Sequence, residues 1–275
     1  MLISKLFLIV KFRTMKTQMN TNSTIPGILM LIVFLLCFQV KPVAQVTVYQ
    51  YRQVPDDKIE DFIFRETTYW SKVAEKALEK GNLSFWGIFQ KVGGYDLPNS
   101  SNFLFINTFR NIDSSGEIWD PSAIFPGVPM DQMETYSISK VTSEFFLHDE
   151  NWAQSAKANP EKDFKYVLMN YQTSSYPDSF AGLEKKYWQP FIKKAMDNNQ
   201  TSQVGWGDAV VLVPSGDNIK FTNVSYDLFT TLQDALLPRW DAALQFPNSG
   251  LTALNKIELN RRGRVIYRVV KVVAK

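Results

Sequence analysis

The chain has 275 residues, with 30 Lys and Arg against 27 Asp and Glu, so its formal net charge is only +3. This balance gives no basic surface of the kind that binds nucleic acid, and we expect no nucleic-acid partner. Cys37 is the single cysteine, which excludes an intrachain disulfide and a cysteine metal site. We expect neither a metal nor a cofactor.

The first 45 residues have the pattern of a secretory leader. Residues 28–38 form an unbroken apolar run with basic residues before it. Such a run has the length of a signal-peptide core and is short for a membrane span. Cleavage after Ala44 or Gln45 would release an exported protein, periplasmic or extracellular, of about 230 residues. An uncleaved leader is the alternative, and it would then provide the contact with a membrane.

The first half of the mature chain alternates between strand and helix patterns. Residues 46–54 are rich in β-branched and aromatic side chains, which predicts a strand. Apolar residues at three- and four-residue steps then predict a helix that Gly81 ends. The predicted elements are a strand at 46–54, a helix at 58–80, strands at 83–92 and 103–109 with a turn at Gly93-Gly94 between them, and a helix at 130–156.

The second half repeats this order. Its predicted elements are a strand at 164–172, a helix at 179–198, strands at 204–213 and 219–225, a helix at 226–244 interrupted near Pro238, and closing strand residues within 254–273 around a turn at Arg261-Arg262-Gly263. The arginines of that turn are typical of a solvated hairpin tip, and an anion site is the alternative.

Short identical patterns relate the two halves. ETTYW at 66–70 returns as EKKYW at 184–188, and Trp86-Gly87 returns as Trp206-Gly207. A set of identities that keeps one order indicates two copies of one supersecondary unit. We therefore divide the mature chain into copies at 46–160 and 161–275.

The order β-α-β-β-α, with a final β, is the split βαβ or ferredoxin-like order. With this order and repeat the chain resembles the dimeric α/β-barrel superfamily, including its NIPSNAP-like and EthD-like members. The resemblance implies an α+β fold in which two tandem ferredoxin-like units form one intramolecular barrel. Some relatives are small monooxygenases or haem-degrading enzymes, and others have no known activity. The fold does not choose among these functions.

In such a barrel one face of each sheet carries helices and the other faces a shared space. Strand alternation places the following candidate ligand-binding residues on common faces, which we expect to line the space between the sheets: Gln50, Arg52, Trp86, Asn107, Asn170, Trp206, Asp208 and Asn223. Tryptophans with a few amide or charged groups suit a mostly apolar pocket. The alternative is that both tryptophans are core residues and that the amides bind one another or water.

Other residues have simpler interpretations. Tyr69-Trp70 and Tyr187-Trp188 lie on predicted helices that cover the sheets, which favours a structural role. His148 is the sole histidine, so haem ligation or imidazole catalysis would have to use it, and its place late in a predicted helix is typical of a solvated side chain. The catalytic residues, if there are any, stay unassigned.

Three functions remain open. The first is an exported protein that binds a small, partly apolar molecule between its two halves. The second is a cofactor-independent oxygenase or isomerase in which Arg52 or Asp208 polarises the substrate. The third is a structural or interaction protein whose barrel is filled by its own side chains.

Overall fold

The computed structural model describes residues 45–92, 100–216, 219–259 and 263–274. Residues 1–44 of the predicted leader, the Gly93-Gly94 turn and the arginines at 261 and 262 lie outside these ranges. Residues 43–275 group into one compact unit, which holds both copies of the repeat. None of the described helices is long and apolar enough to cross a bilayer.

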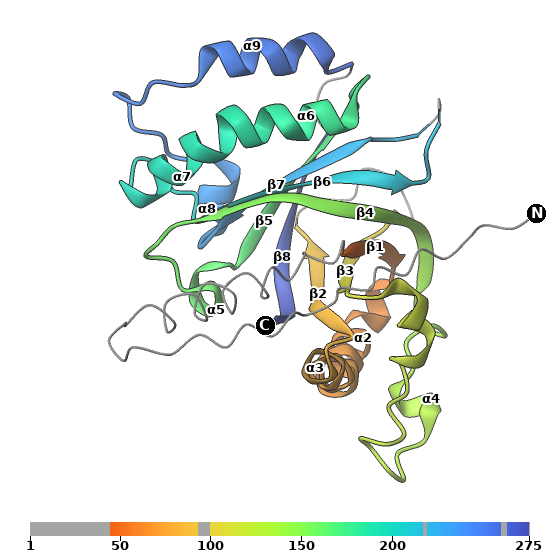
Figure 1. Ribbon diagram of the computed structural model, residues 1–275. Helices are drawn as coiled ribbons and strands as arrows, with labels where there is room; N and C mark the ends of the chain where they lie inside the picture. Colours follow the sequence, from red (N-terminus) through yellow and green to blue (C-terminus); the bar gives the residue numbers. More distant parts are fainter. Residues whose placement is uncertain (1–44, 93–99, 217–218, 260–262, 275) are drawn as a thin grey trace, which may run out of the picture. The chain divides into compact units, whose positions relative to one another are not determined.

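Within the described residues, eight antiparallel strands close into a barrel (Figure 1). Their order around the barrel is β1-β3-β2-β8-β5-β7-β6-β4. The strands are β1 (Val46–Gln53), β2 (Leu83–Lys91), β3 (Phe103–Phe109), β4 (Lys140–Gln154), β5 (Tyr166–Gln172), β6 (Gly205–Val213), β7 (Asn223–Phe229) and β8 (Gly263–Ala274). The first three strands of each copy form one side of the barrel, and β4 and β8 join the two sides.

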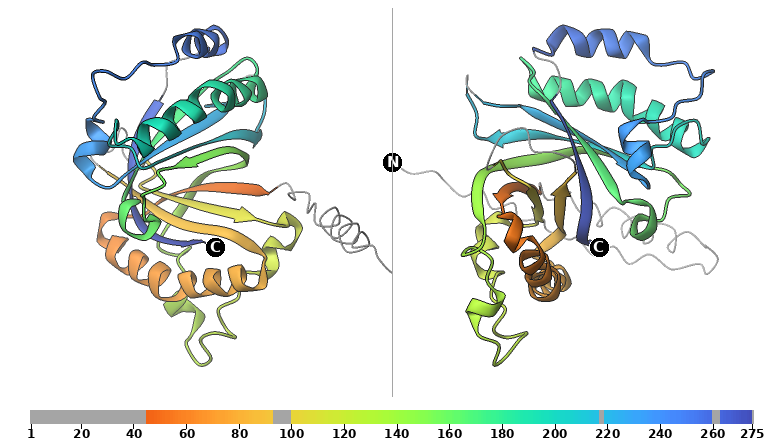
Figure 2. Two further views of the ribbon diagram at one scale, coloured as in Figure 1. Left: turned by 60° about the vertical axis from the view of Figure 1, so that its left-hand side comes forward. Right: turned by 180° about the vertical axis from the view of Figure 1, so that it is seen from behind.

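Helices cover the barrel on two opposite sides (Figure 2). One side carries α2 (Ile59–Arg65), the π-helical turn η2 (Glu66–Trp70) and α3 (Ser71–Lys80). The other carries α6 (Pro177–Leu183), the π-helical turn η4 (Glu184–Trp188) and α7 (Gln189–Asp197), with α9 (Asn248–Ile257) packed outside them. The shorter helices are η1 (Asp56–Lys58), η3 (Ile112–Glu117), α4 (Met130–Met133), α5 (Pro160–Asp163) and α8 (Leu232–Leu236).

The two copies are fused ferredoxin-like units, as the sequence predicted. The repeated pentapeptides form the same element, a π-helical turn inside a longer helix, in both copies. Strand registers match as well, because Trp86 lies opposite Asn107 and Trp206 lies opposite Asp227. Positions 120 residues apart are therefore structurally equivalent in these strands.

The helix predicted over 130–156 is wrong. Only α4 is helical there, and the strand β4 occupies Lys140–Gln154. Phe145 and Leu147 alternate with less buried neighbours and point into the barrel. Long-range pairing of β4 with β1 and β6 overrides the local helical spacing, since without β4 the barrel would stay open between those strands.

The end of the second copy also differs from its prediction. The strand predicted at 219–225 lies at Asn223–Phe229 as β7, so the helix predicted over 226–244 is reduced to α8. A helix, α9, occupies Asn248–Ile257, where the beginning of the closing strand was expected, and β8 begins at Gly263. Tyr226 and Leu228 face the barrel interior from β7.

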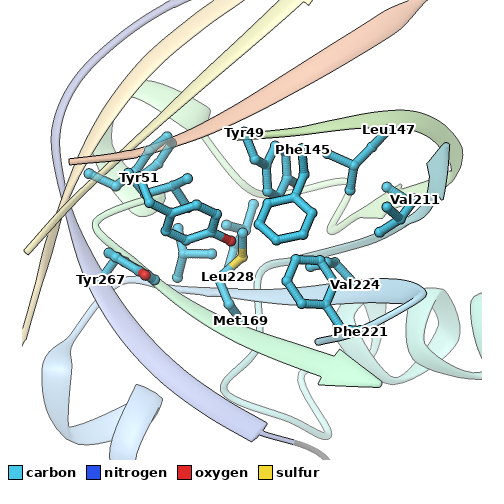
Figure 3. Packing of buried hydrophobic residues seen from close by; sticks show 14 residues of the cluster. Tyr49, Tyr51, Phe145, Leu147, Met169, Val211, Phe221, Val224, Leu228 and Tyr267 are labelled. Carbon is cyan, nitrogen blue, oxygen red and sulfur yellow. The ribbon is translucent and has the colours of Figure 1, made fainter. Parts of the chain in front are cut away.

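The apolar core has separate parts inside and outside the barrel. The lumen is filled by side chains from the strands and from the β6–β7 connection, with Tyr49, Phe145, Met169 and Phe221 among them (Figure 3). Outside the barrel, clusters of buried residues pack the helices onto the sheet in each copy. Most strands are thus buried on both faces.

Candidate functional site

The predicted site residues do not face the space between the two copies. Trp86 packs beneath α2 and α3, and Trp206 packs beneath α7. The prediction that they project into the lumen is therefore wrong. The other candidates share their faces: Gln50, Arg52, Asn107, Asn170, Asp208 and Asn223. Alternation correctly grouped the residues, but the strands are apolar on both faces, so alternation could not tell which face a helix covers.

In the first copy this helix-covered face is closed. Arg52 Nη1 lies 3.7 Å from Glu66 Oε1, and Thr135 donates a hydrogen bond of 2.7 Å to the same oxygen. The Arg52 guanidinium stacks over the ring of Phe105, with its Cζ 4.6 Å from the ring centroid. Gln50 accepts a 2.7 Å hydrogen bond from Arg52 Nε. Arg52 is thus part of a buried ion pair beneath the helices of the first copy.

Burial determines the protonation of this cluster. Burial raises the pKa of Glu66 to about 7, although the Arg52 charge and the Thr135 hydrogen bond oppose the change. The Asn107 Oδ1 atom is buried with no hydrogen-bond partner in the described structure. Such an atom carries a desolvation cost of roughly 1–3 kcal/mol.

In the second copy the equivalent face contains a pocket of about 250 Å³ between the sheet, η4 and α9. Its aromatic and apolar wall consists of Leu168, Trp188, Trp206, Phe229, Pro238, Trp240, Leu251 and Leu254. Its polar wall consists of Asn170, Glu184, Gln203, Ser225, Asp227 and Arg264. Two predicted site residues, Asn170 and Trp206, are among these.

Differences between the copies explain why this face is hollow in the second copy and packed in the first. Phe105 of the first copy corresponds to Ser225 of the second, and Leu83 corresponds to Gln203. Both first-copy side chains fill the core beneath α2 and α3. Their smaller or polar counterparts leave space over the second sheet, where the same backbone arrangement is kept.

Asp208 lies behind this wall, in a pair of carboxyl groups. It hydrogen-bonds Glu184 of η4, and both of its oxygens accept from Asn151 Nδ2 at 2.9 and 2.8 Å. Burial raises the pKa of Asp208 to about 6, and the hydrogen bonds to Asn151 and Glu184 oppose that increase. A hydrogen bond between two carboxyl groups requires one proton, so this pair can store a proton at the pocket wall.

A second polar group holds the Asp227 carboxylate in place. Asn170 donates to Asp227 Oδ2 at 2.9 Å, and Gln203 donates to Oδ1 at 2.7 Å. These amide donors are thus engaged with protein. Asn223 instead donates to the Pro177 carbonyl at 3.0 Å, is equivalent to Phe103 rather than to Asn107, and does not line the pocket.

Sequence reasoning missed Glu184, Trp188 and Trp240 as pocket residues. Glu184 belongs to the repeated pentapeptide, and an acidic side chain at a buried helix position was the available signal. Trp188 was interpreted as structural, and it both lines the pocket and packs against Trp240, with their ring centroids 6.3 Å apart. Trp240 lies in a segment without regular structure and carried no local signal.

His148 lies away from the pocket. It belongs to β4 and its Nδ1 is 2.7 Å from Glu150 Oε1, with both side chains about one-third exposed. Among the described residues, no group of three histidine, cysteine, aspartate or glutamate side chains could hold a metal ion. The polar and aromatic groups of the pocket wall are carboxyl groups, amides, a hydroxyl group, an arginine and indole rings.

No protein-family profile and no curated protein matches this chain. Among solved structures, a presumed monooxygenase from Lactobacillus acidophilus NCFM is 10% identical, with a TM-score of 0.54, and the match covers 84% of this chain and 96% of that chain. A presumed monooxygenase from Fusobacterium nucleatum subsp. nucleatum is 9% identical, with a TM-score of 0.54 and coverage of 86% and 96%. A chlorite dismutase mutant from Candidatus Nitrospira defluvii is 9% identical, with a TM-score of 0.44 and coverage of 82% and 90%.

This protein has the dimeric α/β-barrel fold. Identities near 10% show the fold alone, and they assign neither an activity nor a ligand.

Proposed function

We propose that this is an exported protein that binds a small, partly apolar molecule in the pocket of its second copy. The observation that carries the proposal is the difference between two equivalent faces. The first is packed by Phe105 and Leu83, whereas the second presents Ser225 and Gln203 to a pocket of about 250 Å³. Pockets for drug-sized ligands begin near 300 Å³, so the ligand is a smaller molecule.

The proposed binding pocket does not lie in the lumen between the copies, where the sequence predicted it. The lumen between the copies is packed by the protein's own side chains, as the structural alternative supposed, but the pocket lies outside the lumen. Export rests on the leader pattern, and a closer relationship to NIPSNAP-like or EthD-like proteins rests on the order of elements. Both remain part of the proposal.

Filling the pocket tests the binding function. Ser225→Phe restores the ring that the first copy has at Phe105, and we expect it to abolish binding of small aromatic fragments. Ser215→Phe is the matched control, because Ser215 is exposed on the β6–β7 connection. Binding would be measured by ligand-observed NMR and by tryptophan fluorescence, with circular dichroism to verify folding. Equal binding by folded Ser225→Phe protein would contradict the proposed site.

An oxygenase or isomerase is the second candidate. The carboxyl pair of Asp208 and Glu184 favours it, because a carboxyl group with a raised pKa can accept and return a proton near neutral pH. The fold shared with presumed monooxygenases is compatible with this activity. Oxygen uptake with a panel of phenols and hydroquinones should then occur with the wild type and fail with Glu184→Gln. Absence of uptake by the wild type would favour binding alone.

A further inference from the structure

In the first copy, the side chain of Arg52 places a cation at the helix-covered face. Arg52 is only 6% exposed, and its guanidinium lies between the rings of Phe105 and Tyr136, at 4.6 and 4.5 Å from their centroids. The same guanidinium faces the buried carboxyl group of Glu66. Aromatic faces and a carboxylate are the two groups that stabilise a desolvated cation.

The second copy keeps the glutamate and lacks the arginine. Glu184 is equivalent to Glu66 in the repeated π-helical turn, and Gln172 stands where the first copy has Arg52. The ring of Phe105 is also replaced, by Ser225. The pocket reaches both Glu184 and Ser225, so it extends into the region that Phe105 occupies in the first copy. The buried Gln172 side chain, at the Arg52 position, hydrogen-bonds Ser225 Oγ beside it.

The remaining pocket wall favours the same kind of ligand. Asn170 and Gln203 direct their amino groups at Asp227, so these two amides leave their oxygens, rather than their donors, for a ligand. Trp188 and Trp240 meet at an interplanar angle of 62°, which forms an aromatic corner. Arg264 is the residue of the pocket wall whose positive charge would repel a cation, and it is exposed near the beginning of β8.

We propose that the ligand of this pocket is a small organic cation, with an ammonium or guanidinium group on a short apolar body. This inference rests on the proposed binding function. The cationic group lies against Glu184, as Arg52 lies against Glu66, and the apolar body packs against the tryptophans. In the second copy the bound ligand thus supplies the cation that Arg52 supplies in the first copy.

Three probes of similar shape and different charge test this inference on the leaderless protein, residues 46–275. They are benzylamine, benzyl alcohol and benzoate, titrated at pH 7.5 by calorimetry and ligand-observed NMR. We expect benzylamine to bind at least about tenfold more tightly than benzyl alcohol, and benzoate to bind more weakly than both. Equal or tighter binding of the alcohol or of benzoate would overturn the proposal that the ligand is a cation. The proposal that this pocket binds a ligand would still stand.

Two variants identify the groups responsible. Glu184→Gln should reduce the preference for benzylamine over benzyl alcohol to within about threefold, because it removes the carboxyl group and keeps the size. Gln172→Arg, compared with Gln172→Met, should exclude benzylamine by supplying an internal cation. If either substitution prevents folding, the three-probe series with the wild type still decides the matter. If none of the probes binds, the proposal of a cationic ligand is rejected. The Ser225→Phe fragment experiment then decides separately whether the pocket binds anything.

Discussion

At the residue scale, two equivalent glutamates lie in different environments. Glu66 and Glu184 occupy the same place in a repeated π-helical turn, and both are buried. Glu66 faces a guanidinium and Glu184 hydrogen-bonds a second carboxyl group, that of Asp208. Irregular helical turns of this kind often occur at functional sites, and here the turn directs an acidic side chain toward the sheet.

The raised pKa of Glu66 has a consequence for stability. Its pKa rises from 4.5 to about 7 on folding, so between these values the folded protein holds a proton that the unfolded chain releases. The free energy of unfolding contributed by Glu66 therefore falls as pH rises from about 4.5 to about 7. Protonation removes the charge of a buried glutamate and with it the cost of desolvating that charge, whereas an arginine cannot lose its charge.

This asymmetry predicts unequal effects of breaking the ion pair. Glu66→Met leaves a buried guanidinium and should cost about 3–5 kcal/mol at pH 5. It should cost less at pH 8, because only the wild type loses the stability that protonated Glu66 contributes. Arg52→Met leaves a carboxyl group that can be protonated, so it should cost less at pH 5 than at pH 8. Urea unfolding at the two pH values measures both. Lys76→Met, which breaks an exposed pair with Glu79, is the control and should change stability by less than about 0.5 kcal/mol. An Arg52→Met cost at pH 5 equal to that of Glu66→Met would contradict the argument.

At the scale of elements, α9 completes the pocket by packing closely on η4. A Cβ atom at Gly250 would lie 2.4 Å from the Cβ of Tyr187, so only glycine permits this approach. Leu251 and Leu254, on the same helix, form part of the pocket wall. The position of α9, and with it the closure of the pocket, depends on this contact.

Gly250→Ala should therefore displace α9. We expect a loss of about 1–3 kcal/mol in the free energy of unfolding and faster hydrogen exchange over residues 248–257. Gly182→Ala is the matched control, because a Cβ there meets no atom within 4 Å. That change should stabilise the protein by up to about 1 kcal/mol, since alanine restricts the unfolded chain. Similar effects of the two substitutions would show that the contact with Tyr187 is not the cause.

At the scale of the whole molecule, the two copies form one barrel because β4 and β8 each bridge them. β4 pairs with β1 and β6, and β8 pairs with β5 and β2, which are equivalent arrangements. Inside the lumen the hydroxyl groups of Tyr51 and Tyr171, 120 residues apart, lie 2.9 Å from each other in a hydrogen bond. A single copy would expose both its lumen side chains and its strand edges.

Residues 46–160 expressed alone should consequently dimerise. In such a dimer, β4 of each protomer would pair with β2 of the other, as β4 pairs with β6 in the full chain. Size-exclusion chromatography with light scattering would give the mass, and the mass calculated for one chain of residues 46–275 is the reference for one barrel. A stable, folded monomer of the isolated copy would contradict this view of the barrel.

The sequence alone determined the duplication, most of the strands and the two long helices. These follow from local signals, namely repeated short patterns, β-branched runs and helical spacing that ends at Gly81, where φ is +80°. It also determined which residues share a face of each strand. Tertiary structure decided which face is covered by helices, because side chains on both faces are apolar and alternation is symmetric between them. It also made 140–154 a strand, since only pairing across the barrel, beyond the reach of local spacing, favours that conformation. The pocket is likewise a tertiary property, because Glu184, Ser225 and Trp240 are distant in sequence and meet only when α9 closes over the second sheet.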